Sequence, residues 1–313
     1  MPFAKVNGAS LYFEESGAGI PIVWVHPPLM TSKIFTVQHD QLANEFRVIS
    51  FDIRGHGQSQ PSRMPIDYAQ ISDDIVALLD LLQIEKCFIG GYSTGGTVTL
   101  ETMLSYPDRF YGGIQLSTMP EVSHFHLKMK LNLAIAVARM RAMRLLTWSL
   151  AYGNANNRHM YKHLYDDALT GDLHNITEYF EYSLRYRCTD YLDRLELPQL
   201  LIYGQRDTSF LRYAYMMMQR LPHSEVYLVP RQSHQLPTKA GTQVGQLVRH
   251  WIRNLPIYAE HSHVRRLKKT VSAIVKDRSA FACVNDQANI EQGSPFIDRQ
   301  KPSLMDTEFE NQR

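Results

Sequence analysis

Short apolar segments alternate with amphipathic helical segments along the chain, and this alternation restricts the fold more than any other feature. The segments predicted as strands are 22–26, 47–53, 86–92, 112–117, 199–204 and 224–230. The segments with helical periodicity are 33–45, 70–82, 95–106 and 240–254. Strands and helices that alternate in this way form a mostly parallel sheet with helices on both faces. The sequence therefore predicts an α/β fold.

Two segments depart from this alternation. Residues 3–16 carry the dipeptide Asn7-Gly8 between two alternating stretches, a pattern that predicts a β-hairpin. From 120 to 190 no buried strand is evident, and helical periodicity rich in Met, Leu, Tyr and Arg takes its place. We interpret 120–190 as a helical cap inserted over one end of the sheet. Residues 1–119 and 191–255 then form the core.

The C-terminal extension, 256–313, differs in character from the core. Its segment 264–278 has apolar residues at helical spacing together with six Lys or Arg and one acidic residue. A basic helix of this kind suits an anionic membrane surface or a partner. It is more often a solvated surface helix, which is the interpretation that we favour. From about 285 onward the chain is polar and is predicted to be disordered.

Charge and cysteine content exclude several classes of protein. The 33 Lys and Arg balance 31 Asp and Glu, which gives no electrostatic basis for binding nucleic acid. Cys87, Cys188 and Cys283 lie far apart and form neither a disulfide framework nor a metal-binding spacing. The N-terminus lacks the apolar core of a signal peptide, and no apolar stretch reaches the ~18 residues of a membrane span. We expect a soluble cytoplasmic protein.

The segment Gly91-Tyr92-Ser93-Thr94-Gly95 stands where a predicted strand ends and a helix begins. Gly-x-Ser-x-Gly in this context describes a nucleophile elbow, a tight turn that lifts the serine hydroxyl off the sheet. Small flanking residues let neighbouring segments approach the turn. The alternative is a glycine-rich helix start that serves only packing. We favour the elbow, with Ser93 as the candidate nucleophile.

A serine hydroxyl needs a base to take its proton and an acid to orient that base. In this type of fold the acid and the base follow the serine in the order Asp, His, each after a strand. Asp207 stands three residues past a predicted strand, and His234 lies in a loop four residues past Pro230. Capping of the following helix is the competing role for Asp207, and Glu121 is an alternative acid.

Other histidines compete with His234 for the role of base. His26, His56 and His223 are the rivals, but none of them lies downstream in a loop of the required kind. Order and placement therefore favour His234. A mechanism built on serine, histidine and aspartate requires no metal and no organic cofactor.

Four motifs together identify a family resemblance. “FDIRGHGQS”, “GYSTGG”, “YGQRDTSF” and “RQSHQLP” occur in this order between residues 3 and 255. They resemble the α/β-hydrolase superfamily, in particular its capped branch of esterases, carbon–carbon bond hydrolases and cofactor-free perhydrolases. The resemblance implies Ser93 as nucleophile, His234 as general base and Asp207 as the acid that orients it. It also implies that the loop Asp52-x-Arg54-Gly55-His56-Gly57 is structural.

The resemblance raises a question about the loop after the first parallel strand. In the superfamily this strand ends in His-Gly-x, and x donates one backbone N–H to the oxyanion, while the residue after the nucleophile donates the other. Here His26 matches, but Pro27 and Pro28 follow it, and Pro28 has no N–H. Losing one such donor costs about 3 kcal/mol of transition-state stabilisation.

Thr94 remains available as one oxyanion donor, so a replacement is needed only for Pro28. We predict the Leu29 N–H as this second donor. The hydroxyl of Thr31 or of Ser32 is the alternative. If none of these groups substitutes, hydrolysis is expected to be weak.

The cap segment contains flexible sulfur and aromatic side chains that suit an apolar acyl pocket: Met129, Met140, Met143, Trp148 and Tyr152. Packing of the cap onto the core is the alternative role for these side chains. The leading functional prediction is a carboxylesterase-like serine hydrolase acting on a small or medium, apolar acyl ester. A carbon–carbon hydrolase or a perhydrolase with the same triad is the alternative enzyme. A ligand-sensing protein without enzymatic activity is the alternative class. The sequence predicts no oligomeric state.

Overall fold

The structure, a computed structural model, describes residues 3–259 of the chain. Its strands are β1 (Phe3–Val6), β2 (Ala9–Ser16), β3 (Pro21–Val25), β4 (Arg47–Phe51), β5 (Cys87–Tyr92), β6 (Phe110–Leu116), β7 (Gln199–Gly204) and β8 (Ser224–Val229). Over the described residues they form one eight-stranded sheet in the order β1-β2-β4-β3-β5-β6-β7-β8. β2 runs antiparallel to both of its neighbours, and the pairs from β4 to β8 are parallel. The predicted mostly parallel sheet is confirmed.

The helices alternate with these strands along the chain, as the sequence predicts. They are η1 (Ser32–Phe35), α1 (Thr36–Leu42), α2 (Tyr68–Leu81), α3 (Thr94–Ser105), η2 (Pro107–Arg109), α4 (Phe125–Arg139), α5 (Met143–Asn154), α6 (Arg158–Ala168), α7 (Leu173–Arg185), η3 (Thr189–Arg194), α8 (Thr208–Arg220), α9 (Leu236–Lys239) and α10 (Gly241–Asn254). None of the helices in the described part of the chain is long and apolar enough to cross a membrane. The predicted basic helix at 264–278 and the tail after it lie outside the described residues.

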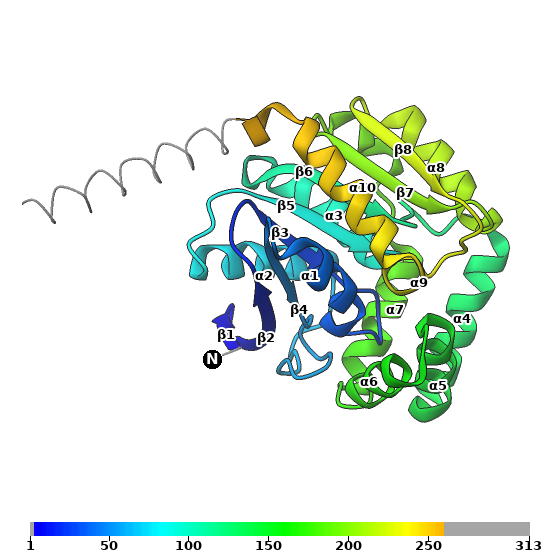
Figure 1. The fold of residues 1–313 in the computed structure, drawn as a ribbon. Coiled ribbons are helices and arrows are strands. Elements are labelled where there is room, and N and C mark those ends of the chain that lie inside the picture. The colour runs from blue at the N-terminus through cyan, green and yellow to red at the C-terminus, as the bar shows by residue number, and fades with distance from the viewer. Residues whose placement is uncertain (1–2, 260–313) are drawn as a thin grey trace, which may run out of the picture. The chain divides into compact units, whose positions relative to one another are not determined.

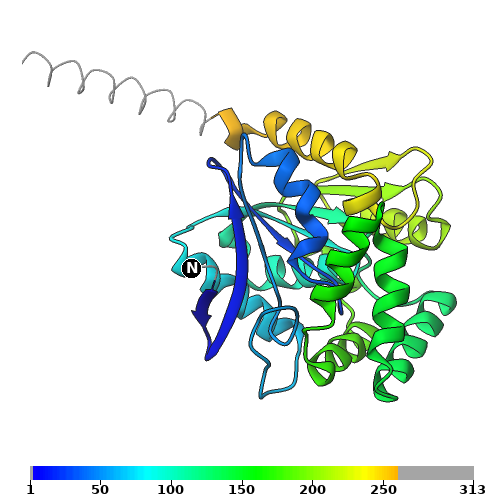
Figure 2. The same cartoon turned by 60° about the horizontal axis from the view of Figure 1, so that its bottom comes forward.

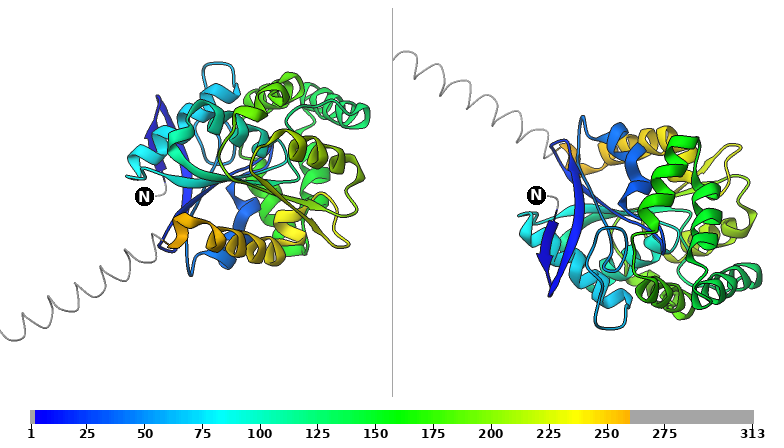
Figure 3. Two further views of the ribbon diagram at one scale, coloured as in Figure 1. Left: turned by 90° about the horizontal axis from the view of Figure 1, so that it is seen from above. Right: turned by 90° about the horizontal axis from the view of Figure 1, so that it is seen from below.

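Two apolar clusters form on opposite faces of the sheet, because side chains of a strand alternate between its faces. Along β3, Val23 and Val25 belong to the cluster that packs against α2, α3 and α8. Ile22 and Trp24 belong to the other cluster, which packs against α1 and α10. Figure 1 shows the order of these elements, and Figure 3 shows α1 and α10 on one side of the sheet with α2 and α3 on the other.

Helices α4 to α7, which we call the cap helices, lie between β6 and β7 in the sequence. Figure 2 shows them, in green shades, grouped beside one end of the sheet. They share a small apolar cluster of their own, made of Ile135, Ala138, Leu146, Ala168, Ile176 and Phe180, and Leu29 of the core joins it. The loop after β3 is therefore packed into the interior of the cap helices.

Local details differ from the predicted boundaries for identifiable reasons. The hairpin prediction is confirmed, with φ of 45° at Asn7 and 76° at Gly8 in the turn. The expected helix at 33–45 is instead the short 3₁₀ helix η1 followed by α1, and the Thr31 side chain caps η1. β3 ends at Val25, so His26 stands outside the strand and is free to bond across the loop.

Candidate active site

Ser93 stands in a strained turn between β5 and α3. Its φ of 55° and ψ of −123° lie in a region that L-residues rarely adopt. The backbone N–H of Ser93 donates to Leu116 O at 2.9 Å, which ties the turn to β6. Such strain persists only where the surroundings fix it, and it holds the hydroxyl above the carboxyl ends of the strands.

The glycines that flank Ser93 are required by close backbone approach. A Cβ on Gly95 would lie 2.2 Å from Val25 O, and a Cβ on Gly91 would lie 2.5 Å from the backbone of Gly95. Any side chain at either position would push α3 away from β3 and β5. The Gly-x-Ser-x-Gly spacing is thus a packing condition for the turn at Ser93.

A chain of two hydrogen bonds joins the three side chains that the sequence singles out. His234 Nδ1 lies 2.9 Å from Asp207 Oδ2, and His234 Nε2 lies 3.1 Å from Ser93 Oγ. Because a carboxylate only accepts, Nδ1 carries the proton, and the Nε2 lone pair faces the serine hydroxyl. The Asp207 side chain is 9% exposed and that of His234 is 22% exposed. The side chain of the base, His234, is therefore partly exposed to solvent, while that of the acid, Asp207, is nearly buried.

Two aromatic rings hold the His234 imidazole in this orientation. The ring centroids of Phe210 and His234 lie 4.1 Å apart, and those of Tyr92 and His234 lie 5.2 Å apart. The Tyr92 hydroxyl donates to Asn154 Oδ1 of α5 at 3.1 Å. Sequence reasoning missed Phe210 and Asn154, because only the fold brings α8 and α5 beside the histidine loop.

The two candidate acids, Asp207 and Glu121, have different hydrogen-bond partners. Asp207 stands at the N-cap position of α8, but its side chain makes no capping hydrogen bond and faces His234 instead. Glu121 accepts a hydrogen bond from Thr189 Oγ1 at 2.7 Å and forms an ion pair with Arg187. Glu121 is thus engaged with other partners, and Asp207 is the carboxylate that contacts the imidazole.

The rival histidines are placed in other roles. His26 Nε2 accepts from Ile53 N at 2.9 Å, and His26 Nδ1–H donates to Pro27 O at 2.9 Å. Burial lowers the pKa of His26 to about 4 and that of His56 to about 3, so both rings are neutral near pH 7. His223 is exposed and lies 3.5 Å from a carboxylate oxygen of Glu196.

The double proline after β3 forms a tight turn. Met30 N donates to Pro27 O at 3.2 Å, and Leu29 has a φ of 68°. Proline at the second position and a positive φ at the third are the marks of a type II turn. The ring of Pro28 fixes the φ angle that the turn requires. The His26 side chain donates a hydrogen bond to the carbonyl of Pro27, the first residue of the turn.

The groups proposed as oxyanion donors differ in whether they already donate a hydrogen bond within the protein. Within the described residues, the backbone N–H of Thr94 and that of Leu29 donate to no other protein group. The Thr31 hydroxyl donates to Asp167 Oδ2 of α6 at 3.0 Å. The Ser32 side chain is fully buried, and its N–H donates to Asp52 Oδ1. Leu29 is therefore the donor in this loop with the fewest competing contacts.

The loop at 52–57 has the contacts of a structural element. Asp52 accepts from Ser32 N at 2.8 Å and from Gln58 N at 3.0 Å, and burial is the main cause that raises its pKa. Arg54 and Asp74 of α2 form a buried ion pair, in which Arg54 donates two hydrogen bonds of 2.5 and 2.6 Å. These bonds connect the loops after β3 and β4 to α2.

Two of the predicted acyl-pocket side chains of the cap, Trp148 and Tyr152, line an open hollow of about 590 Å³ together with Tyr161 and Lys239. The exposed fractions are 54% for Met129, 70% for Met140, 51% for Trp148 and 70% for Tyr152. Only Met143 is partly buried, at the edge of the cap cluster. The acyl-pocket role therefore stays a prediction for Trp148 and Tyr152, whereas the exposed side chains of Met129 and Met140 point outward from the cap helices. Packing onto the core is not observed for these four residues.

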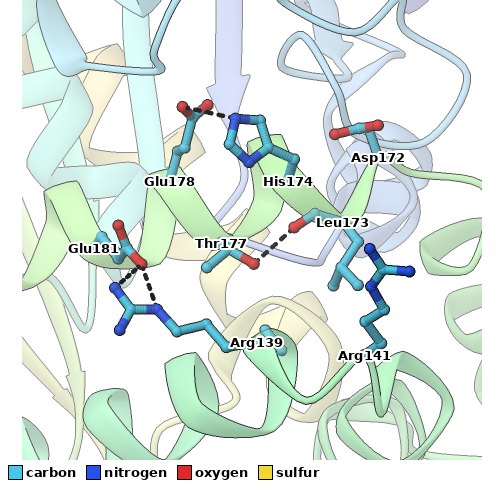
Figure 4. Close-up of a pocket in the computed structure, with 9 residues that line it drawn as sticks. Arg139, Arg141, Asp172, Leu173, His174, Thr177, Glu178 and Glu181 are labelled. Atoms are coloured by element: carbon cyan, nitrogen blue, oxygen red, sulfur yellow. Dashed lines mark hydrogen bonds and ion pairs between the residues drawn. The ribbon is translucent and has the colours of Figure 1, made fainter.

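A hollow of about 600 Å³ lies between α4 and α7 (Figure 4). Ion pairs mark its rim: Arg139 with Glu181 at 2.7 Å and His174 with Glu178 at 3.2 Å. None of its lining residues belongs to the group around Ser93. Over residues 3–259, no three His, Cys, Asp or Glu side chains gather so as to hold a metal ion.

The chain matches a known protein family over most of its length. A family model described as “Serine aminopeptidase, S33” matches residues 24–238, a stretch that contains Ser93, Asp207 and His234. The chain is 35% identical over 95 residues to the AB hydrolase superfamily protein YisY of Bacillus subtilis. That match covers 30% of this chain and 35% of the relative. The chain thus spans about a third of the length of the curated relatives that head the comparison.

Solved structures share the fold over most of the described chain. A thermophilic esterase from Thermogutta terrifontis has a TM-score of 0.70 at 24% identity, covering 80% of this chain and 96% of its own. The enol-lactonase from Burkholderia xenovorans has a TM-score of 0.72 at 19% identity, covering 81% and 100%. At these identities the likeness concerns the fold alone, and it confirms the α/β-hydrolase fold prediction.

Proposed function

Because the chain belongs to the serine aminopeptidase family of the α/β-hydrolase superfamily, we propose that it is a carboxylesterase-like serine hydrolase. The proposed substrate is a small or medium carboxylic ester, cleaved through an acyl-enzyme intermediate. The observation that carries the proposal is the hydrogen-bond chain from Asp207 through His234 to Ser93, at 2.9 and 3.1 Å.

In the acylation step, Ser93 Oγ attacks the ester carbonyl carbon while His234 Nε2 takes the hydroxyl proton. The carbonyl oxygen becomes an oxyanion, and the N–H groups of Thr94 and Leu29 donate to it. Asp207 stabilises the imidazolium that forms and keeps the proton on Nδ1. When the tetrahedral intermediate collapses, His234 returns the proton to the departing alkoxide, which leaves as an alcohol.

The deacylation step repeats this chemistry with water. His234 takes a proton from the water as its oxygen attacks the acyl carbon, and the second tetrahedral intermediate uses the same oxyanion donors. Collapse breaks the bond between the acyl carbon and Ser93 Oγ, and the proton returns from His234 to the serine. The products of this step are a carboxylic acid and the free enzyme, and the proposed reaction uses no cofactor.

Turnover of short p-nitrophenyl esters, together with labelling by a fluorophosphonate, tests the proposal. The full chain should be labelled once, and Ser93→Ala should abolish both labelling and ester turnover. Thr97→Ala is the matched control, since Thr97 lies on the same helix α3 and its hydroxyl donates to Met119 O rather than into the site. It should remain active.

The outcomes distinguish the proposed enzyme from its alternatives. Labelling of the Ser93→Ala protein would overturn the assignment of the nucleophile. Labelling of the parent without turnover of any ester would instead favour the carbon–carbon hydrolase or perhydrolase chemistry on the same residues. A protein that is neither labelled nor active would favour the ligand-sensing alternative.

A further inference from the structure

The outward face of α4 is apolar along its whole length. Phe125, Met129, Leu133 and Met140 are 68, 54, 65 and 70% exposed. At about 100° per residue these side chains fall within an arc of about 80°. The buried Ile135 lies outside that arc, on the side of α4 that packs into the cap cluster. Because α4 is covered on one side only, its exposed stripe is a surface feature of the cap helices.

Helix α5 carries a second outward stripe. Leu145, Trp148 and Tyr152 are 58, 51 and 70% exposed. The rings of Trp148 and Tyr152 stack with centroids 6.0 Å apart. Aromatic side chains of this kind, with an apolar body and a polar edge, favour the boundary between water and an apolar phase.

The chain segment that carries these stripes has charges of one sign. Between residues 122 and 165 the sequence has seven Lys or Arg and no Asp or Glu. The whole chain has 31 acidic residues among 313, so a segment of this length would carry about four at the average frequency. The segment that forms α4, α5 and most of α6 is thus cationic as well as outwardly apolar.

Most of these Lys and Arg side chains form no ion pair within the described part of the protein. Arg139 turns toward α7 and pairs with Glu181 (Figure 4). Lys128, Lys130, Arg141 and Arg144, in contrast, form no ion pair with any described residue, and all four are exposed. The apolar stripe of α4 therefore has unpaired cations on either side of it.

From this combination we propose that the outer face of α4 and α5 docks on an anionic lipid surface. The stripes would enter the boundary between headgroups and acyl chains, with the helices in the plane of the surface and the cations on the lipid phosphates. A second copy of this chain is a poorer occupant, since the same unpaired cations would face each other. The inference does not depend on the chemistry proposed for Ser93.

Tryptophan fluorescence offers a direct test in the full chain. The protein has three tryptophans. Trp24 and Trp251 are 0 and 2% exposed, while Trp148 is 51% exposed and lies on the proposed surface. Vesicles of phosphatidylcholine with roughly one third phosphatidylglycerol should bind the protein and shift its emission to the blue, and bromine-labelled acyl chains should quench it. Pure phosphatidylcholine vesicles and high salt should weaken both effects.

Two sets of variants separate the cap surface from other basic segments. Lys128→Glu, Lys130→Glu and Arg144→Glu together should lower vesicle affinity by at least about 100-fold, since each cation contributes about fivefold. The matched control reverses three exposed cations of the core and has the same net charge: Lys5→Glu, Arg63→Glu and Arg220→Glu. It should bind within about threefold of the parent.

Replacing the exposed Met129 and Leu133 by serine should lower affinity by at least about tenfold without a change in charge. The proposal is overturned if the protein does not bind anionic vesicles, or if the core control loses as much affinity as the cap variant. It is also overturned if vesicle-bound protein shows no change at Trp148, because another segment then carries the binding. If the emission shifts to the blue with rising protein concentration in the absence of lipid, the outer face of α4 and α5 mediates self-association instead.

Discussion

The hydroxyl of Tyr179, on cap helix α7, donates a hydrogen bond of 3.1 Å to the backbone carbonyl of His26. Tyr179 is fully buried. One residue of α7 therefore holds the start of the loop that carries the proposed oxyanion donor Leu29. Leu29 belongs to the same apolar cluster as Ile176 and Phe180 of α7, so α7 supports the loop through this cluster as well as through the Tyr179 hydrogen bond.

Tyr179→Phe should lower kcat for ester turnover by roughly three- to tenfold, since it removes one buried hydrogen bond to the loop and keeps the ring packing. KM should change little, because the side chain acts on the oxyanion loop rather than on the substrate. The control is Tyr182→Phe on the same helix, whose hydroxyl bonds to no described residue. Equal kcat values for the two variants would contradict a positioning role for Tyr179.

The turn at Pro28 predicts the geometry of a covalent adduct. A phosphonate bound to Ser93 should place its oxygen ~2.7–3.1 Å from the backbone nitrogens of both Thr94 and Leu29. The reason is that Pro28 has no N–H, and Thr31 is already committed to Asp167. A crystal structure of the adduct measures both distances. An oxygen that meets only Thr94 and water would mean half an oxyanion hole and slow turnover.

Replacement of Asp207 distinguishes the two candidate acids. Asp207→Asn should reduce kcat by roughly 10³- to 10⁴-fold, because the imidazole loses both its orientation and the charge that stabilises its protonated form. Glu121→Gln should stay within a few-fold of the parent, since Glu121 bonds to Thr189 and Arg187 instead. The measurement is steady-state turnover of a p-nitrophenyl ester. The opposite ranking of the two variants would transfer the role of acid to Glu121.

The elements that position the candidate site could be predicted from the sequence. Buried strands are continuous apolar runs, and the elbow at Ser93 has glycines that the fold requires at fixed positions. Because the carboxyl ends of parallel strands lie at one edge of the sheet, the sequence predicts Asp207 and His234 near Ser93. These inferences succeed because local chain chemistry and strand direction fix the positions.

The cap could not be predicted to the same depth. Helix α4 has apolar residues on several sides, so its periodicity does not tell which side faces the core. The sequence therefore predicts a pocket position for Met129, although its side chain lies at the surface. Tyr179 gave no signal either, because its role depends on a contact with His26, 153 residues away. Contacts of this kind follow from tertiary packing and not from spacing.

Acid sensitivity offers a last prediction, centred on His56. Burial lowers the pKa of His56 to about 3, and its Nε2 is a buried nitrogen without a hydrogen-bond partner in the described structure. An unfolded chain has a histidine pKa near 6.5. Below that pH the unfolded state binds a proton that the folded state does not, so the free energy of unfolding falls as pH falls from about 6.5 toward about 3.

His56→Gln should therefore be less sensitive to acid than the parent. Between about pH 7.5 and about pH 5, its loss in free energy of unfolding should be smaller by about 2 kcal/mol, as measured by urea denaturation. Glutamine retains a donor for the carbonyl of Arg54, which His56 Nδ1 contacts at 3.2 Å. The control His126→Gln changes an exposed histidine and should keep the pH dependence of the parent. If His56→Gln loses as much stability as the parent over this range, the buried neutral ring is not a source of the acid sensitivity.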